Sequence, residues 1–408
     1  MAALLRYFRD LDTAEEAFQE ACLRAIKAWP DKGPPRDPVA WLIFVGRNFG
    51  VDQIRKTARQ TELPDDDRIS DLDDVETPMA ERLDDQHYRD DVLRLLFICC
   101  HPDLPSTQQI ALALRIVSGL TVKEIARAFL VSEAAMEQRI TRAKRKVGAG
   151  SVEFGAPDAV ERLARLRTVS AMIYLVFNEG YSASGGEAHI RASLCEEAIR
   201  LARLLLRLFP AEPEVMGLNA LMFFQHSRRR ARLDADGQIV LLDDQDRTLW
   251  DRELIAEGFA LLDKAFRHRR AGSYQIQAAI AGEHARAKTP EDTDWSTIDG
   301  LYAVLEQVQP SPVVSLNRAV AISKLRGPEE ALAYVEPLAD KLSGYFHFYG
   351  VRGGLLKQLG RVEEAREAFD RAIALASTPA EAAHIRMELD RLDADGSAGK
   401  DARSAAVG

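Results

Sequence analysis

Residues 119–147 constrain the fold of this chain most, because their apolar positions follow two short helical periods separated by a tight turn. Thr121, with Glu124 three residues later, fits a capping box at the start of a first helix. Ser132 fits the N-cap of a second helix, and Leu130-Val131 fits the turn between the two. The apolar stripes of the two helices are Val122, Ile125, Ala126 and Phe129, and then Met136, Ile140, Ala143 and Val147. The stretch therefore predicts a helix-turn-helix.

The second helix of this pair has a polar side that suits DNA. Opposite its apolar stripe the pattern places Ala134, Gln138, Thr141 and Arg145. Eight Lys/Arg and three Glu lie between residues 115 and 146, a local net charge of +5. Small and amide side chains followed by bases are typical of a helix in the major groove between phosphates. The alternative is a basic helix pair with no nucleic-acid role, and Leu130 stands where glycine is usual.

Composition places the rest of the chain in the all-α class. At 408 residues, with 7% aromatic residues, we expect two or three mainly helical domains. We expect no membrane span and no signal peptide, because charges interrupt every apolar run. Four cysteines are too few for a disulfide framework, which indicates the cytoplasm. A net charge of −9 confines any DNA contact to local basic patches.

The first 29 or so residues have the period of one amphipathic helix. Its expected buried face is Ala14, Ala17, Phe18, Ala21, Cys22, Ala25 and Ile26. Its opposite face is acidic and amide-bearing, and consists of Asp12, Glu15, Glu16, Gln19 and Glu20. Such a face is either simply solvated or docks a basic partner surface.

A proline-rich loop over residues 30–38 leads into a second helix that begins near Pro38. This helix carries Trp41 near its start and amide and basic residues toward its end. A rigid loop, a tryptophan and a basic helix form a credible surface for base stacking or strand separation. A purely structural Trp41 in the core is the equal alternative.

Residues 62–91 have the composition of a linker, with thirteen Asp/Glu and three Arg. An apolar helix over residues 92–100 follows it. Cys99, Cys100 and His101 adjoin one another, but no second cluster supplies further metal ligands, so we expect buried thiols.

From about residue 153 to residue 392 the pattern predicts helix after helix. Ala331 and Ala365 occupy matching positions 34 residues apart, the period of the tetratricopeptide (TPR) repeat. Helical hairpins of this kind stack into a solenoid with a concave binding surface. We expect a low-complexity, disordered tail over residues 396–408.

No nucleotide-binding, zinc-protease or hydrolase motif occurs, so the chain is expected to be no enzyme and to need no cofactor or metal. Residues 177–181 are interpreted as a helix end with Gly180 at C′. Residues 250–258 and 291–295 are interpreted as packing and capping segments.

Three segments together resemble the RNA polymerase sigma factors of the extracytoplasmic-function (ECF) type: DTAEEAFQEACLRAIKAWP, DPVAWLIFVGRNFGVDQIRK and residues 120–147. Further stretches, including DDVLRLLFICCHPDL, YLVFNEGYSAS and LLDDQDRTLWDRELIAEG, resemble the ECF group with a long TPR-like extension. The resemblance implies sigma region 2 at 1–60, an acidic linker at 61–90, region 4 at 91–150 and the extension at 151–395. Region 2 is expected to be shortened, because only eight residues precede RDLDTAEEA.

The resemblance also implies roles for individual residues. Residues that read the −35 promoter element are expected to be Ser132, Ala134, Glu137, Gln138, Arg139, Thr141, Arg142, Arg145 and Lys146. Residues that read and open the −10 element are expected to be Lys32, Arg36, Trp41, Arg47, Asn48, Asp52, Gln53, Arg55 and Lys56. The residues expected to dock on polymerase are Asp12, Glu15, Glu16, Gln19 and Glu20.

The implied partners are core RNA polymerase (its β′ coiled coil and β flap), promoter DNA, and a protein or peptide ligand of the TPR-like extension, which would modulate activity. One alternative is a standalone helix-turn-helix regulator whose TPR-like half binds a protein signal. Another is a TPR scaffold with vestigial DNA-binding modules.

Overall fold

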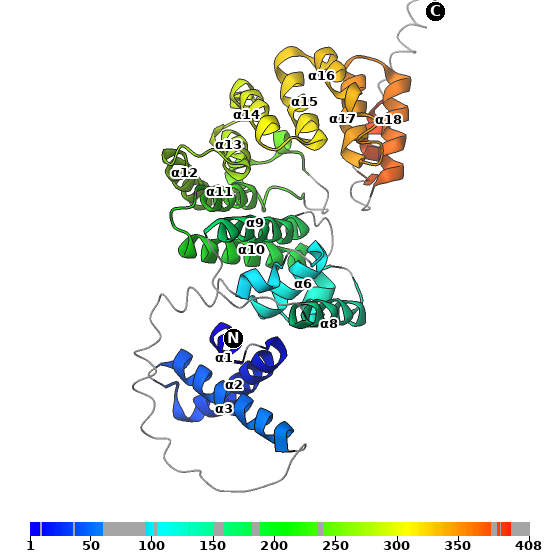
Figure 1. Cartoon of the computed structure of the whole chain (residues 1–408). Helices are drawn as coiled ribbons and strands as arrows, with labels where there is room; N and C mark the ends of the chain where they lie inside the picture. The colour runs from blue at the N-terminus through cyan, green and yellow to red at the C-terminus, as the bar shows by residue number, and fades with distance from the viewer. Residues whose placement is uncertain are drawn as a thin grey trace, which may run out of the picture. The chain divides into compact units, whose positions relative to one another are not determined.

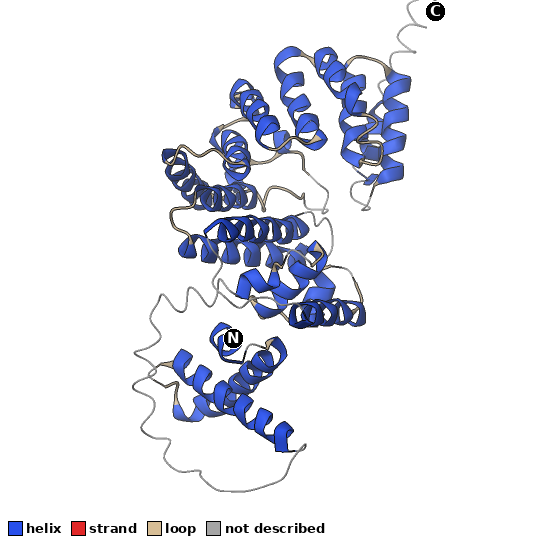
Figure 2. Ribbon diagram, in the orientation of Figure 1, coloured by secondary structure: helices blue, strands red, loops and turns tan. Residues whose placement is uncertain are grey.

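The computed structural model describes residues 1–8, 10–35, 37–59, 95–101, 104–129, 131–149, 159–181, 188–234, 240–376, 382–383 and 385–392. These residues form α-helices and short 3-10 helices joined by turns and loops (Figure 2), which confirms the all-α prediction. The chain divides into two compact units, Met1–Val176 and Phe177–Gly408. Of the helices so described, none is long and apolar enough to cross a membrane. The predicted linker at 61–90, the predicted tail at 396–408, Arg36 and Leu130 lie outside the described residues.

The first unit begins with three helices that pack on one another: α1 (Ala2–Phe8), α2 (Leu11–Lys32) and α3 (Pro38–Arg59) (Figure 1). Small residues allow the helix backbones to approach closely. A Cβ atom on Gly46 of α3 would lie 2.9 Å from the carbonyl oxygen of Ala17 and 2.9 Å from Cδ1 of Leu4. Real Cβ atoms do not approach backbone oxygens this closely, so the crossing of α2 and α3 depends on this glycine.

The prediction of one helix over residues 1 to about 29 is wrong, because the chain breaks between α1 and α2. Asp10 starts α2: its carboxylate accepts hydrogen bonds from the Thr13 N–H at 2.8 Å and the Thr13 hydroxyl at 2.5 Å. The predicted loop over residues 30–38 is also too long. Pro30 lies inside the last turns of α2, which ends at Lys32, and Gly33 at φ 76° terminates the helix.

Residues 95–99 form a buried helical segment, which ends at Cys99, next to Cys100. Cys99 is 0% and Cys100 is 3% exposed, which confirms the expected buried thiols. Burial raises the pKa of the Cys100 thiol to about 12 and also raises the pKa of the Cys99 thiol, so both stay protonated at neutral pH. Within the described part of the chain, no group of three His, Cys, Asp or Glu side chains could hold a metal ion.

Three further helices of the first unit pack together: α6 (Ser106–Ile116), α7 (Val122–Ala128) and α8 (Glu133–Ala149). The stripe predicted for α8 is buried, with exposed fractions of 0% for Met136, 5% for Ile140 and 0% for Ala143. The buried Gln109 of α6 donates from Nε2 to the carbonyl oxygens of His101 and Leu104, both at 3.0 Å. This amide joins the preceding loop to the three-helix core.

The second unit is a succession of helices, and the boundary between the units falls within α9 (Ala159–Tyr181). The helices that follow are α10 (Ala188–Leu208), α11 (Pro213–Ser227), α12 (Arg252–Arg267), α13 (Ser273–Arg286), α14 (Trp295–Val308), α15 (Pro312–Arg326), α16 (Pro328–Val335), α17 (Phe346–Gln358) and α18 (Val362–Leu375). The short 3-10 helices are η1 (Leu242–Asp244), η2 (Arg247–Leu249), η3 (Pro290–Asp292) and η4 (Glu336–Leu338). From α10 onward each α-helix contacts the next (Figure 1), and α11 also contacts α13 and α15 also contacts α17, so the unit is built from packing between helices close in sequence.

Two segments interpreted as capping segments do cap helices. The Asp251 carboxylate accepts from the Leu254 N–H at 3.2 Å at the start of α12, and Asp294 accepts from the Thr297 N–H at 2.9 Å at the start of α14. The interpretation of Gly180 as a C′ residue is wrong, because α9 continues through it to Tyr181. Tyr181 stacks on Phe177 with ring centroids 5.5 Å apart, and this stacking extends the helix beyond the glycine.

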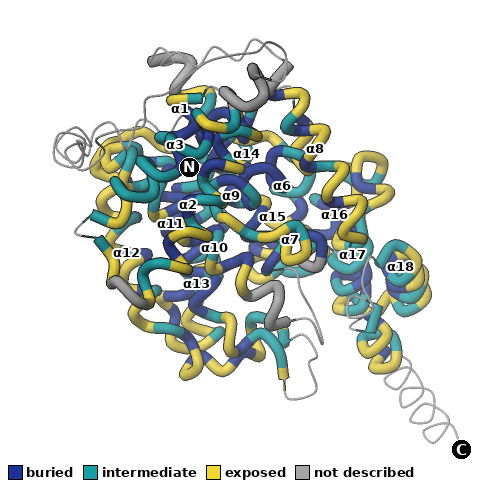
Figure 3. The backbone as a smooth tube through the Cα atoms, turned by 90° about the horizontal axis from the view of Figure 1, so that it is seen from below, coloured by how far each residue is buried: buried dark blue, intermediate teal, exposed yellow. Residues whose placement is uncertain are grey.

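Helix α11 is the most enclosed helix of the second unit and is dark blue over most of its length in Figure 3. It packs against α10, α12 and α13. Its Gly217 faces α13 directly: a Cβ atom there would lie 2.6 Å from the backbone nitrogen of Gln275. Two backbones therefore meet at this point, with no flexible side chain between them that could move aside.

We expect Gly217→Ala to destabilise the second unit by about 2 kcal/mol, because the added methyl group must push the α11 and α13 backbones apart. Chemical denaturation followed by circular dichroism measures the change. Gly300→Ala in α14 is the matched control, since a Cβ there meets nothing within 4 Å. The control should be stabilising by about 0.5 to 1 kcal/mol, because alanine favours a helix interior. Equal effects of the two changes would contradict the close contact.

Candidate nucleic-acid interface

The helix-turn-helix is held by the caps that its sequence predicts. At the start of α7, the Thr121 N–H donates to Glu124 Oε2 at 2.7 Å, and the Glu124 N–H donates to Thr121 Oγ1 at 3.2 Å. The Thr121 N–H and the Thr121 hydroxyl, which both donate to Glu124 Oε2, lower the pKa of the Glu124 carboxyl group, since they favour its ionised form. At the start of α8, Ser132 Oγ accepts from the Ala135 N–H at 3.2 Å. Both helices of the motif therefore begin at fixed residues.

The structure places most of the candidate −35 residues on the exposed side of α8. Exposed are Ser132, Ala134, Glu137, Gln138, Thr141, Arg142, Arg145 and Lys146. Arg139 is half-buried, and the hydroxyl group of Ser132 is used in the cap. The exposed side of α8 carries an amide and a hydroxyl group in the middle of the helix and basic side chains toward its C-terminal end. This arrangement can contact base edges and phosphates together.

The candidate −10 residues lie on α3 and at the end of α2, and the structure describes only some of their side chains. Trp41, Arg47, Asn48 and Gln53 are half-buried and Asp52 is exposed. The guanidinium group of Arg47 lies 4.4 Å from the ring centre of Tyr7, and the rings of Trp41 and Trp29 are 5.5 Å apart. The side chains of Lys32, Arg55 and Lys56 lie outside the described residues. Trp41 therefore has one face on a second tryptophan, and both interpretations of it stay open.

The acidic face of α2 is divided between exposed and paired side chains. Glu16 and Gln19 are exposed. Glu20 pairs with Arg24 along the same helix at 2.9 Å. Glu15 and Asp12, in contrast, pair with basic residues of the helix-turn-helix: Glu15 with Arg115 and Lys144, and Asp12 with Lys144.

The expectation that Ile26 is buried is wrong, because its side chain is 70% exposed. Leu23 is also exposed, at 52%. At 100° per residue, Leu23 and Ile26 lie on the same side of α2 as Glu16 and Gln19. The exposure of Leu23 and Ile26 could have been read from the sequence, since alanines spaced three and four apart already supply the buried face of α2. The exposed side of α2 is thus both polar and apolar, as protein-binding surfaces are.

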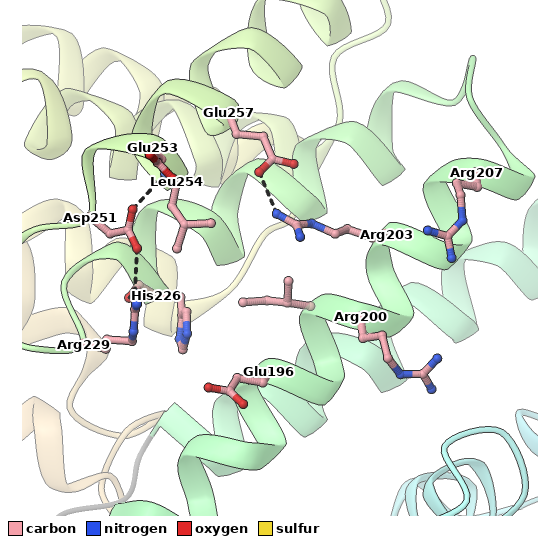
Figure 4. Close-up of a pocket in the computed structure, with 11 residues that line it drawn as sticks. Glu196, Arg200, Arg203, Arg207, His226, Arg229, Asp251, Glu253, Leu254 and Glu257 are labelled. Atoms are coloured by element: carbon pink, nitrogen blue, oxygen red, sulfur yellow. Dashed lines mark hydrogen bonds and ion pairs between the residues drawn. The ribbon is translucent and has the colours of Figure 1, made fainter.

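A polar groove of about 570 Å³ lies in the second unit between α10, the end of α11 and α12 (Figure 4). Arg200, Arg203 and Arg207 line it from α10, and Asp251, Glu253 and Glu257 line it from the α12 side. Arg203 pairs with Glu257 at 2.6 Å across the groove, and Arg229 pairs with Asp251 at 3.1 Å. Because opposite charges balance within it, the groove has no clear preference for an anion or a cation.

His226 lines the same groove and is only 7% exposed. Burial, with a further contribution from the nearby Arg229, lowers its pKa from 6.5 to about 4. The imidazole is therefore neutral at physiological pH. No local sequence pattern predicts this groove, because its residues come from separate helices.

Comparison with known proteins finds three family matches along the chain. Sigma-70 region 2 matches residues 1–60, and Sigma-70, region 4 matches residues 94–147. A family of unknown function (DUF6596) matches residues 165–266. An uncharacterized protein of Rhizobium meliloti (strain 1021) is 68% identical over 395 residues, which cover 97% of this chain and 93% of that protein.

A helix-turn-helix with an exposed polar face, on a chain that also carries a separate three-helix module, defines a DNA-binding protein of the promoter-recognition class. The region 2 and region 4 matches support a sigma factor of the sigma-70 family, whose members are transcription initiation factors rather than enzymes. Core RNA polymerase and promoter DNA are the partners that these matches imply.

Proposed function

We propose that the protein is an ECF-type sigma factor of the cytoplasm, which binds core RNA polymerase and recognises −10 and −35 promoter elements, with a TPR-like extension that modulates its activity. The observation that carries the proposal is the exposed face of α8, where eight of the nine candidate −35 residues are exposed while the opposite stripe is buried. Region 2 would cover residues 1–60, the linker 61–90, region 4 residues 91–150 and the extension 151–395.

The roles of individual residues follow from where their side chains lie. Gln138, Thr141 and Arg142 are exposed in the middle of α8, where a helix in the major groove reaches base edges. Arg145 and Lys146 lie nearer its C-terminal end and would contact phosphates. We assign opening and reading of the −10 element to α3 and its preceding loop.

For polymerase docking we propose the exposed side of α2 and add two residues to it. Glu16 and Gln19 supply polar contacts, and Leu23 and Ile26 supply apolar area that the free chain leaves exposed. Apolar contact supplies affinity while charges orient the partner.

The packing of α15 to α18 supports a TPR-like extension. Ala331 and Ala365, which are 34 residues apart, are both 0% exposed within one core. A Cβ atom on Gly353 would lie 2.6 Å from the Phe369 ring, so α17 and α18 pack as a close hairpin. Small residues at corresponding positions of successive hairpins are typical of helical repeats.

DNA binding with and without core polymerase tests the proposal against the standalone regulator. Two weak base-reading surfaces on separate modules bind promoter DNA tightly only when polymerase holds both at the right separation. We therefore expect weak binding by the free protein and strong binding by the holoenzyme, on a fragment from upstream of its own operon. Tight, sequence-specific duplex binding without polymerase would favour the standalone regulator instead. Glu16→Ala and Gln19→Ala would then also be silent.

We expect removal of the residues after 150 to change promoter output about fivefold or more, because a built-in regulator couples to activity with a free energy of about 1 to 3 kcal/mol. In vitro transcription with the shortened and full-length chains measures the change. The control is polymerase binding by the shortened chain, which shows that its first two modules are folded. Equal promoter output from two folded chains would exclude a regulatory extension.

A further inference from the structure

The acidic N-terminal part of α2 contacts the helix-turn-helix through three short ion pairs. Arg115 Nη2 lies 2.6 Å from Glu15 Oε1, and Lys144 Nζ lies 2.6 Å from Glu15 Oε2 and 2.7 Å from Asp12 Oδ1. Lys144 lies on α8 and Arg115 in the last turn of α6. Two basic residues that lie a hundred or more positions from Glu15 therefore meet at its carboxylate.

Three of the four side chains in this contact are well shielded from solvent, whereas the Asp12 side chain is 73% exposed. Exposed fractions are 13% for Glu15, 18% for Lys144 and 21% for Arg115. Salt and water screen such pairs less than they screen ordinary surface pairs. Burial alone would lower the pKa of Lys144, but hydrogen bonds and charge from Asp12 and Glu15 outweigh it and raise the pKa. The lysine is therefore held in its charged form.

Asp12 and Glu15 are also among the α2 residues that the family resemblance assigns to polymerase docking. We propose that the Asp12–Glu15 end of α2 is a shared docking surface, which holds the chain's own helix-turn-helix in the free protein and must release it before polymerase binds there. This inference rests on the proposed function. The Glu15 side chain is only 13% exposed between Arg115 and Lys144, so a basic group of a partner cannot reach its carboxylate while these pairs are in place, and the two contacts exclude each other.

The contact leaves the face of α8 that would enter DNA free. Gln138, Thr141 and Arg145 are exposed in the same structure, whereas Lys144 lies at the edge of the buried stripe. The contact between α2 and the helix-turn-helix would therefore reduce polymerase binding without covering the base-reading residues. Only molecules in which the contact between α2 and the helix-turn-helix is broken would bind polymerase. The apparent affinity of the protein for polymerase is therefore reduced in proportion to the fraction of such molecules.

Distances between spin labels test the contact in the full-length chain. Labels are placed on Leu23→Cys and Glu133→Cys, which are exposed on α2 and α8, with Cys22 replaced by alanine. We expect one narrow distance distribution, which Lys144→Met lengthens and broadens. Lys144→Arg, which keeps the charge, should preserve it, as should Lys123→Met on the exposed side of α7. A distribution that Lys144→Met leaves unchanged would overturn the proposal.

Titration of unlabelled chains with core polymerase tests the competition. We expect Lys144→Met to tighten binding about fivefold, because more molecules are open, and Lys123→Met to leave binding unchanged. Unchanged or weaker binding by Lys144→Met would overturn the shared surface while leaving the sigma-factor proposal intact. No binding by any of the chains, wild type included, would overturn the proposed function itself, and the shared surface with it.

Discussion

Replacing Gln138 and Arg142 by alanine together is expected to lower promoter-directed initiation about 100-fold, because each well-placed contact to a base edge contributes about 1 to 3 kcal/mol. Both side chains are exposed on α8, and the helix is anchored by a stripe that neither residue touches. The fold and the affinity for core polymerase should therefore stay unchanged. In vitro transcription from a −35-dependent promoter measures the loss.

The matched control for this pair is Arg167→Ala on α9, which removes the same charge from an exposed helix position of the first unit. We expect it to change initiation less than twofold, since general attraction to DNA falls little with one charge. A promoter whose −35 bases are scrambled should lose its dependence on Gln138 and Arg142. Equal losses from the pair and from Arg167→Ala would mean that α8 contributes charge and no readout.

Acidification from pH 6.5 to pH 4 is expected to destabilise the second unit by about 3 kcal/mol for each of two histidines, the buried His226 and the half-buried His284. Burial, reinforced by nearby arginines, lowers the pKa of His226 and of His284 from 6.5 to about 4. The unfolded chain then binds more protons than the folded chain throughout this window. Stability is therefore full above pH 6.5 and is lost as the pH falls toward 4.

Thermal unfolding at a series of pH values measures this loss. His226→Gln and His284→Gln should each remove about half of the histidine-dependent slope, because glutamine does not titrate. His268→Gln, on an exposed side chain after α12, is the control and should leave the slope unchanged. If His226→Gln and His284→Gln leave the slope of stability against pH unchanged, the acid sensitivity comes from carboxylates instead.

The helix-turn-helix could be predicted from sequence nearly residue by residue because its determinants are local. Thr121 and Glu124 are three positions apart, and the buried stripe of α8 repeats within single turns. The break between α1 and α2 was missed because both helices share one period, and only the cap at Asp10 separates them. The apolar period of α2 predicts a buried Ile26, but alanines alone supply the packed face of this helix and Ile26 is exposed.

Long-range pairs could not be predicted from sequence. Lys144 and Asp12 are 132 positions apart, and nothing in either local pattern selects one for the other. The groove between α10 and α12 is likewise built from charged residues that would serve equally well on a solvated surface. Such contacts depend on how helices pack, which the period of each helix alone does not fix.

Run-off transcription with purified core polymerase tests the central claim most directly. The template is the DNA upstream of the protein's own operon, and core polymerase without the protein is the reference. The account predicts a discrete transcript that appears only with the full-length chain and is lost with the Gln138 and Arg142 substitutions. A chain that binds this DNA by itself yet directs no initiation with polymerase would contradict it.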